Sequence, residues 1–201
     1  MLIASVLAAA ALSAPAPAIV ADPIPYGRGR RGQMAAYSKR HYGTASARLR
    51  PKVVVLHFTA GSTYRSAWET FASNDPNRGE LPGTCAHFVV DKDGTIYQLV
   101  RLSLRCRHAI GVNHVALGIE MVQEQGAGSH WADQQILRRK PQIRAVLRLV
   151  RWLQESYGIA NEDVIGHAMA NDHRRFRDDE GWTNDHTDWL SQDVRAFRKR
   201  L

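Results

Sequence analysis

The stretch V-V-V-L-H-F-T-A-G-S, residues 53–62, sets the architecture of this chain. A continuous run of β-branched and apolar residues is typical of a strand that is buried on both faces of a sheet. His57 stands at the end of this run, where a rigid strand would hold its imidazole in place. A histidine here is either a buried residue at the edge of the core or a metal ligand, and the rest of the chain must decide between them.

Strand and helix patterns follow one another along the rest of the chain. Apolar runs on both sides of Asp93-Gly94 predict a β-hairpin, because Asp-Gly favours a tight turn. Apolar residues recur at helical spacing from Ile143 to Leu153 and predict an amphipathic helix. The other predicted elements are a helix at Thr63–Ser73 capped by Ser62 or Thr63, hairpin strands within Cys85–Asp91 and Thr95–Val100, a buried strand at His114–Gln123, a helix start at Trp131–Lys140, a short strand at Asp163–Gly166 and a terminal helix at Ser191–Leu201.

Length and composition are those of one basic globular domain. The 201 residues are 44% hydrophobic and 23% charged, with a formal net charge of +8. Such a charge favours anionic partners, namely nucleic acid, a membrane surface or an acidic wall polymer. The arginines are not interleaved with aromatic residues, so nothing indicates a nucleic-acid site. Two cysteines, Cys85 and Cys106, fit an exported protein with one disulfide, or else are two buried thiols.

The N-terminal part of the chain divides into a leader and an arm. Residues 1–21 contain an apolar run that ends in small residues, which indicates a signal peptide and therefore export. A membrane anchor or a disordered leader is the alternative. We expect residues 22–50 to form an irregular arm, with a short element near Met34–Tyr42 and with His41 at the surface. Residues 51–201 would then form the catalytic domain.

Residues that can carry chemistry lie within predicted strands and in one late segment of the chain. Glu120 lies inside an apolar strand, where burial raises the pKa of a carboxyl group and suits a general base; a solvent-facing edge position is the alternative. His87 shares a strand face with Val89, so it either faces a cleft or is hydrogen-bonded within the sheet. In the late segment Val164–Trp189, the side chains that we single out as candidate metal ligands or neighbours of the site are His167, His173 (expected to be exposed), Asp185, His186 and Asp188.

These side chains are sufficient for a hydrolytic zinc site. Catalytic zinc takes three protein ligands, leaves one position for water and lowers the pKa of that water. His57, His167 and one late carboxylate would be the ligands, with Glu120 as base. His186 would be a protonated donor to the oxyanion. The H-E-x-x-H pattern of many zinc peptidases is absent.

Four motifs carry a resemblance to a known family. They are L-H-F-T-A at 56–60, A-H-F-V-V-D-K-D-G-T-I-Y-Q-L-V at 86–100, R-H-A-I-G-V-N with L-G-I-E-M-V within 107–122, and V-I-G-H at 164–167. In this order they resemble the zinc-dependent N-acetylmuramoyl-L-alanine amidases of the type-2 amidase and peptidoglycan-recognition-protein superfamily, over Lys52–Trp189. The resemblance implies one α/β domain with a central mixed β-sheet flanked by helices and one Zn²⁺ in a surface groove. It also implies cleavage of the amide between N-acetylmuramic acid and L-alanine.

The resemblance also implies roles for individual residues. His57 and His167 match the family's zinc histidines, and Glu120 matches the acid that activates water. His108 and Asn113 lie in the motif that lines the substrate groove, and we predict His87 as a further substrate contact.

The end of the site departs from the family pattern, which commonly has Lys-x-Asp or Lys-x-Cys before Pro-Gly. Here the chain has H-T-D at 186–188. Aligning Asp188 with the third ligand puts His186 in the catalytic position, while His186 or Asp185 are the alternative ligands. We expect a monomer that acts on peptidoglycan or muropeptides, with no nucleic-acid partner and no membrane span after processing. A non-catalytic peptidoglycan-binding module of the same fold is the alternative function.

Overall fold

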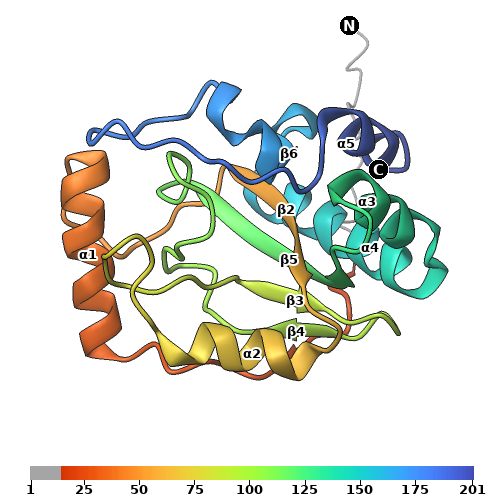
Figure 1. Cartoon of the computed structure of the whole chain (residues 1–201), viewed down its shortest axis with the longest axis horizontal. Coiled ribbons are helices and arrows are strands. Elements are labelled where there is room, and N and C mark those ends of the chain that lie inside the picture. Colours follow the sequence, from red (N-terminus) through yellow and green to blue (C-terminus); the bar gives the residue numbers. More distant parts are fainter. Residues whose placement is uncertain (1–14) are drawn as a thin grey trace, which may run out of the picture.

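Six strands form one mixed sheet in the computed structural model, which describes residues 15–201 (Figure 1). The strand order is β1-β4-β3-β5-β2-β6; β3 and β4 pair antiparallel and the other neighbours pair in parallel. This sheet with its helices confirms the predicted fold class, whereas most of the expected leader lies outside the described residues. The strands are β1 (Val20–Ala21), β2 (Val53–Ala60), β3 (Phe88–Val90), β4 (Ile96–Gln98), β5 (Ala116–Glu124) and β6 (Val164–Gly166).

Helices cover both faces of the sheet. The helices α3 (Ser129–Arg138), α4 (Lys140–Tyr157) and α5 (Ser191–Arg198) share the main apolar core with one face, and α2 (Tyr64–Ser73) packs on the other. Figure 1 shows α1 (Arg28–Tyr42) on the opposite side of the molecule from α3 and α4. Two 3-10 helices, η1 (Asn161–Asp163) and η2 (His167–Asp172), flank β6. Within residues 15–201, no helix is both long enough and apolar enough to cross a bilayer.

Side chains along β2 and β5 point alternately to the two faces of the sheet, so core residues lie on one face and candidate site residues on the other. Leu56 and Ile119 belong to the core beneath α4, so the next residues, His57 and Glu120, point to the opposite face. These two residues are direct neighbours, because β2 and β5 pair in parallel with His57 opposite Glu120. The strand β6 pairs with the other side of β2 and ends at Gly166. The parallel register thus brings distant parts of the chain together on one face of the sheet, where β6 ends.

The elements with a strong local pattern form as predicted. Thr63 caps α2, since its hydroxyl oxygen accepts a hydrogen bond from the Ser66 amide at 3.2 Å. The strands β3 and β4 form the predicted hairpin, and α4 carries Pro141 in its first turn and buries an apolar stripe. Cys85 and Cys106 form a disulfide, which is the first of the two alternatives for this pair.

The expectation of an irregular arm was wrong for residues 28–33, and the short element expected near Met34–Tyr42 is the second part of the 15-residue helix α1. The buried face of α1 includes Arg30, Met34, Tyr37 and His41, which recur at helical spacing. Polar residues at two of these positions hide that pattern in the sequence. The guanidinium of buried Arg30 donates to the carbonyl oxygen of Phe71 at 2.7 Å. Tertiary contacts therefore form this helix, which has two internal glycines and no acidic first turn.

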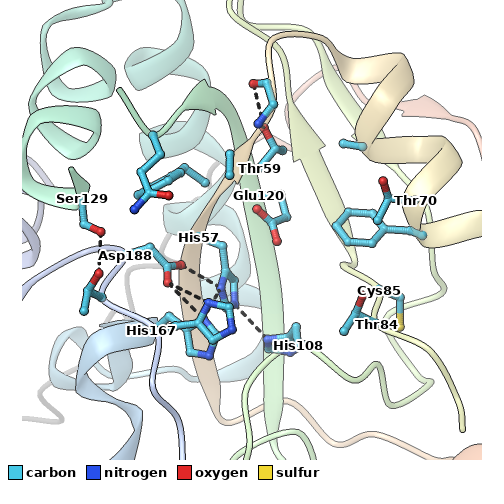
Figure 2. Close-up of a pocket in the computed structure, with 18 of the residues that line it drawn as sticks. His57, Thr59, Thr70, Thr84, Cys85, His108, Glu120, Ser129, His167 and Asp188 are labelled. Carbon is cyan, nitrogen blue, oxygen red and sulfur yellow. Dashed lines mark hydrogen bonds and ion pairs between the residues drawn. The ribbon is translucent and has the colours of Figure 1, made fainter. Parts of the chain in front are cut away.

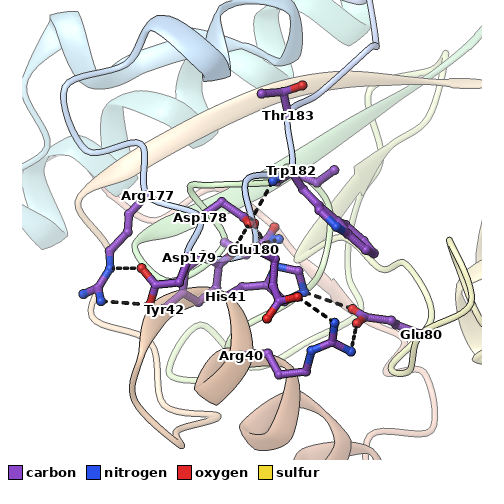
Figure 3. Close-up of polar contacts among 12 residues, drawn as sticks. Arg40, His41, Tyr42, Glu80, Arg177, Asp178, Asp179, Glu180, Trp182 and Thr183 are labelled. Carbon is purple, nitrogen blue, oxygen red and sulfur yellow. Dashed lines mark hydrogen bonds and ion pairs between the residues drawn. The ribbon is translucent and has the colours of Figure 1, made fainter.

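The expectation that His41 lies at the surface was also wrong, because its side chain is fully buried (Figure 3). Its Nδ1 atom lies 2.8 Å from Asp178 Oδ2, and its Nε2 atom lies 3.0 Å from Glu80 Oε2. Trp182 packs edge-on against the ring at 4.9 Å between centroids. We call these four residues the His41 clamp. The clamp ties α1 to the segment that leads into Asp188.

Candidate metal centre

Three side chains from distant parts of the chain converge on the face of the sheet that bears Glu120, beside the carboxyl end of β6 (Figure 2). His57 comes from β2, His167 directly follows β6, and Asp188 precedes α5. The Nδ1 atoms of the two histidines are 3.1 Å apart, and the Asp188 oxygens lie 3.1 Å from Nδ1 of His57 and 3.2 Å from Nδ1 of His167. All three residues are buried. The cluster could hold a metal ion, since its ligand atoms lie within 4.8 Å of one another.

The protonation states of His57 and Asp188 suit a divalent ion. Burial, followed by the nearby His167, lowers the pKa of His57 to about 4, so its imidazole is neutral at pH 7. Burial opposes ionisation of Asp188, but its contacts with His167 and His57 outweigh it and hold the pKa of this carboxyl well below its usual range. Neutral imidazoles with a carboxylate are a donor set that zinc accepts. The donor chemistry of the cluster therefore fits the ion that the sequence motifs imply.

A close backbone crossing holds His167 and Asp188 together. The Ala168 amide donates to the Asp188 carbonyl oxygen at 3.0 Å. A Cβ atom at Gly166 would lie only 1.8 Å from the carbonyl oxygen of Trp189, so only glycine allows this approach. The Trp189 side chain is fully buried and packs edge-on against Phe197 of α5. Asp188 is therefore held in place because the next residue, Trp189, is packed in the core.

Glu120 lies beside His57 on the neighbouring strand and lines the same cavity (Figure 2). Burial, and secondarily the charge of Asp188, raises the pKa of this carboxyl well above its usual range. Its Oε2 atom is buried without a hydrogen-bond partner among the described residues. A carboxyl group that is poorly solvated and unpaired is poised to exchange a proton with a substrate or water.

His186 and Asp185 lie at the rim of the cavity and are exposed. The ring of His186 stacks on His167 at 4.4 Å, with Nδ1 3.9 Å from Asp188 Oδ1. Partial desolvation of the ring and the adjacent His167 lower the pKa of His186, which argues against the protonated imidazole expected from the sequence. Asp185 instead pairs with Arg78 at 3.1 Å. Of the three alternatives for the third ligand, the structure places Asp188 in the cluster.

Two predicted substrate contacts lie behind the cavity rather than in it. His87 is fully buried; its Nδ1 accepts from the Gly118 amide at 3.0 Å and its Nε2 donates to the Leu104 carbonyl oxygen at 2.9 Å. It is the hydrogen-bonded sheet histidine, so the predicted substrate contact is corrected. Asn113 is also fully buried, and its Oδ1 accepts from the amides of His108 and Ala109 at 2.8 Å each. Asn113 therefore shapes the loop and does not touch a ligand in the cavity.

His108 does line the cavity, as predicted, and lies next to the cluster (Figure 2). Its Nδ1 atom is 3.0 Å from Nε2 of His57. His173 was expected to be exposed, but its side chain is largely buried and its Nε2 lies 3.1 Å from Asp163 Oδ1. It therefore belongs to an ion-pair contact outside the cavity.

The cavity is an open groove of about 780 Å³ with small polar side chains on its walls. These residues had no signal in the sequence, because serines and threonines are common on any surface. Their hydroxyl and amide groups can hydrogen-bond a peptide or sugar. They are Thr59, Ser66, Thr70, Asn77, Thr84 and Ser129.

Comparisons with known proteins identify the family and the fold. The family profile described as N-acetylmuramoyl-L-alanine amidase matches residues 47–188. The endolysin N-acetylmuramoyl-L-alanine amidase LysCS from Clostridium intestinale is similar in structure, with a TM-score of 0.54 and 20% identity, over 91% of this chain and 96% of that one. The catalytic domain of XlyA has a TM-score of 0.55 and 18% identity, over 92% and 99% of the two chains. At these identities the likeness shows the fold. No curated protein matches the sequence.

Proposed function

We propose that this chain, which belongs to the N-acetylmuramoyl-L-alanine amidase family, is a zinc-dependent hydrolase. Its reaction would be cleavage of the amide between N-acetylmuramic acid and L-alanine in peptidoglycan or its fragments. The observation that carries the proposal is the meeting of His57, His167 and Asp188 beside Glu120 in one groove. A non-catalytic binding module would need neither a complete ligand set nor an unpaired carboxyl group next to it.

The residues divide the chemistry among them. His57, His167 and Asp188 would hold one zinc ion, which when bound acidifies a water and polarises the scissile carbonyl. Glu120 would take the proton from the attacking water as its oxygen bonds to the carbonyl carbon. The same carboxyl group would pass that proton to the leaving nitrogen when the C–N bond breaks. An N–H of neutral His186 at the rim would donate to the developing oxyanion.

The groove and the rest of the chain support a substrate from the cell wall. A groove with polar walls that is open to solvent can admit a strand of polymer or a free muropeptide. The disulfide between Cys85 and Cys106 supports an oxidising compartment and therefore export. We propose a monomer whose positive charge favours the anionic wall.

Metal content and product analysis test the proposal together. The purified protein should contain about one zinc per chain and release peptides with a free L-alanine amino end from muropeptides. Chelation should stop the release, and zinc should restore it. His57→Ala and His167→Ala should lose both metal and activity, whereas His173→Gln, outside the groove, should keep both. Protein that binds muropeptides without cleaving them would establish the binding module instead.

A further inference from the structure

The ring nitrogens that point away from the cluster each have a specific partner. Nε2 of His167 lies 2.9 Å from Oδ1 of Asn184, and Nε2 of His57 lies 3.0 Å from Nδ1 of His108. Both contacts decide which nitrogen of each histidine carries its proton.

The orientation of the Asn184 side-chain amide is fixed by two backbone groups of Ile110, an N–H that can only donate a hydrogen bond and a carbonyl oxygen that can only accept one. The Ile110 N–H donates to Asn184 Oδ1 at 2.8 Å, and Asn184 Nδ2 donates to the Ile110 carbonyl oxygen at 2.9 Å. Oδ1 is therefore the atom that faces His167, and it can only accept. The Nε2 atom of His167 must carry the proton to make this hydrogen bond. In neutral His167, the lone pair is then on Nδ1, which faces His57 and Asp188.

The same logic runs through His108 to His57. Nε2 of His108 lies 3.3 Å from the Ala116 carbonyl oxygen, which can only accept, so this nitrogen carries the proton. In neutral His108, Nδ1 is then an acceptor and receives the Nε2 proton of His57. The Nδ1 atom of His57 is left with its lone pair directed into the cluster. Gly118 makes room for this relay, because a Cβ atom there would lie 2.8 Å from the His108 ring.

We propose that Asn184 and His108 are positioning residues that keep His167 and His57 in the Nε2-protonated tautomer. Two lone pairs and two carboxylate oxygens then meet without a proton between them, which only a cation satisfies. This inference rests on the proposed function for the identity of that cation. It gives His108 a role in ligand preparation in addition to its place in the groove. Loss of such a partner usually weakens metal binding by about 10-fold to 100-fold.

The experiment compares three variants of the full chain by zinc affinity, measured in competition with a chromophoric chelator. Asn184→Leu removes the acceptor and should weaken zinc binding by about 10-fold to 100-fold. Asn184→Asp keeps an acceptor for His167 and should bind zinc within a few-fold of the wild type. Asn171→Ala is the structural control, because Asn171 Oδ1 accepts from the Asn184 amide and side chain on the exposed side of the loop. It loosens the same loop but leaves the His167 contact, so its zinc affinity should be close to that of the wild type.

A second measurement reads the tautomers directly. In metal-free protein with ¹⁵N-labelled histidine, the two-bond proton–nitrogen correlations should identify Nε2-protonated rings for His57 and His167. Asn184→Leu should shift His167 toward a mixture, and His108→Phe should do the same for His57. Equal zinc affinity in Asn184→Leu and Asn171→Ala, or an Nδ1-protonated His167 in the wild type, would overturn the inference. A wild type that binds no zinc would instead remove the proposed function, which makes the two failures distinguishable.

Discussion

Replacing Glu120 with methionine should raise the stability of the protein while it removes activity. The Oε2 atom of Glu120 is buried without a partner among the described residues, and burial raises the pKa of the carboxyl group well above its usual range. An unsatisfied buried polar group costs about 1–3 kcal/mol. The side chain is half-buried in the groove, which favours the lower end of this range. We therefore expect the free energy of unfolding of metal-free protein to rise by about 1 kcal/mol.

Urea denaturation of metal-free protein measures this change against a control on the same strand. Glu124 is exposed near the end of β5, so Glu124→Met should change the free energy of unfolding by less than about 0.5 kcal/mol. Hydrolysis of muropeptides by zinc-loaded Glu120→Met should fall by about 10²-fold to 10⁴-fold, the usual contribution of general acid–base catalysis. Glu124→Met should keep its activity.

Two results would refute this reasoning. A loss of stability in Glu120→Met would mean that the carboxyl group makes a favourable contact in the groove. Retained hydrolysis would mean that another group moves the proton. The first result would contradict the cost assigned to the buried carboxyl group, and the second would contradict its role in proton transfer.

Three further predictions follow from the packing around the site. Gly166→Ala should lower the free energy of unfolding by at least about 1–3 kcal/mol, because its Cβ atom would meet the Trp189 carbonyl oxygen; an equally stable variant in urea denaturation would contradict the crossing. Burial lowers the pKa of His87 from 6.5 to about 4, so between these pH values the unfolded chain binds a proton that the folded chain refuses. Stability should therefore fall by up to about 3 kcal/mol as the pH drops through this window, and a flat profile from pH 7 to pH 4.5 would argue against it. Reduction of the Cys85–Cys106 disulfide, which closes a loop of 21 residues, should cost about 3 kcal/mol, visible as a lower melting temperature in reductant.

Short-range patterns predicted the sheet and most helices. The apolar run at residues 53–56, the Asp93-Gly94 turn and the apolar stripe of α4 each encode their own conformation, and all three form as expected. His57, His167 and Asp188 were predicted because side chains of metal-ligand type follow strands or resemble a motif. Their meeting required the parallel register of β2 with β5 and β6, which no local pattern contains.

The residues that prediction missed act through tertiary contacts. Asn184 has no metal-ligand chemistry, so its importance comes only from its distance to His167 and Ile110. The buried state of His41 depends on carboxyl groups that lie 39 and 137 residues away in the chain. His87 is a polar side chain in a strand, as a residue that lines the groove could also be. Only the fold shows that it is hydrogen-bonded inside the sheet and does not face the groove.

The His41 clamp has a consequence for anyone who wishes to move this domain into another protein. The family match begins at residue 47, after α1 has ended. A fragment that starts at residue 47 would lack His41, so Glu80 and Asp178 would lose the imidazole between them. The segment that leads to Asp188 would then lose its contact with α1. A fragment intended to fold by itself should therefore start before Arg28. The domain is longer than the part of the chain that matches the family profile.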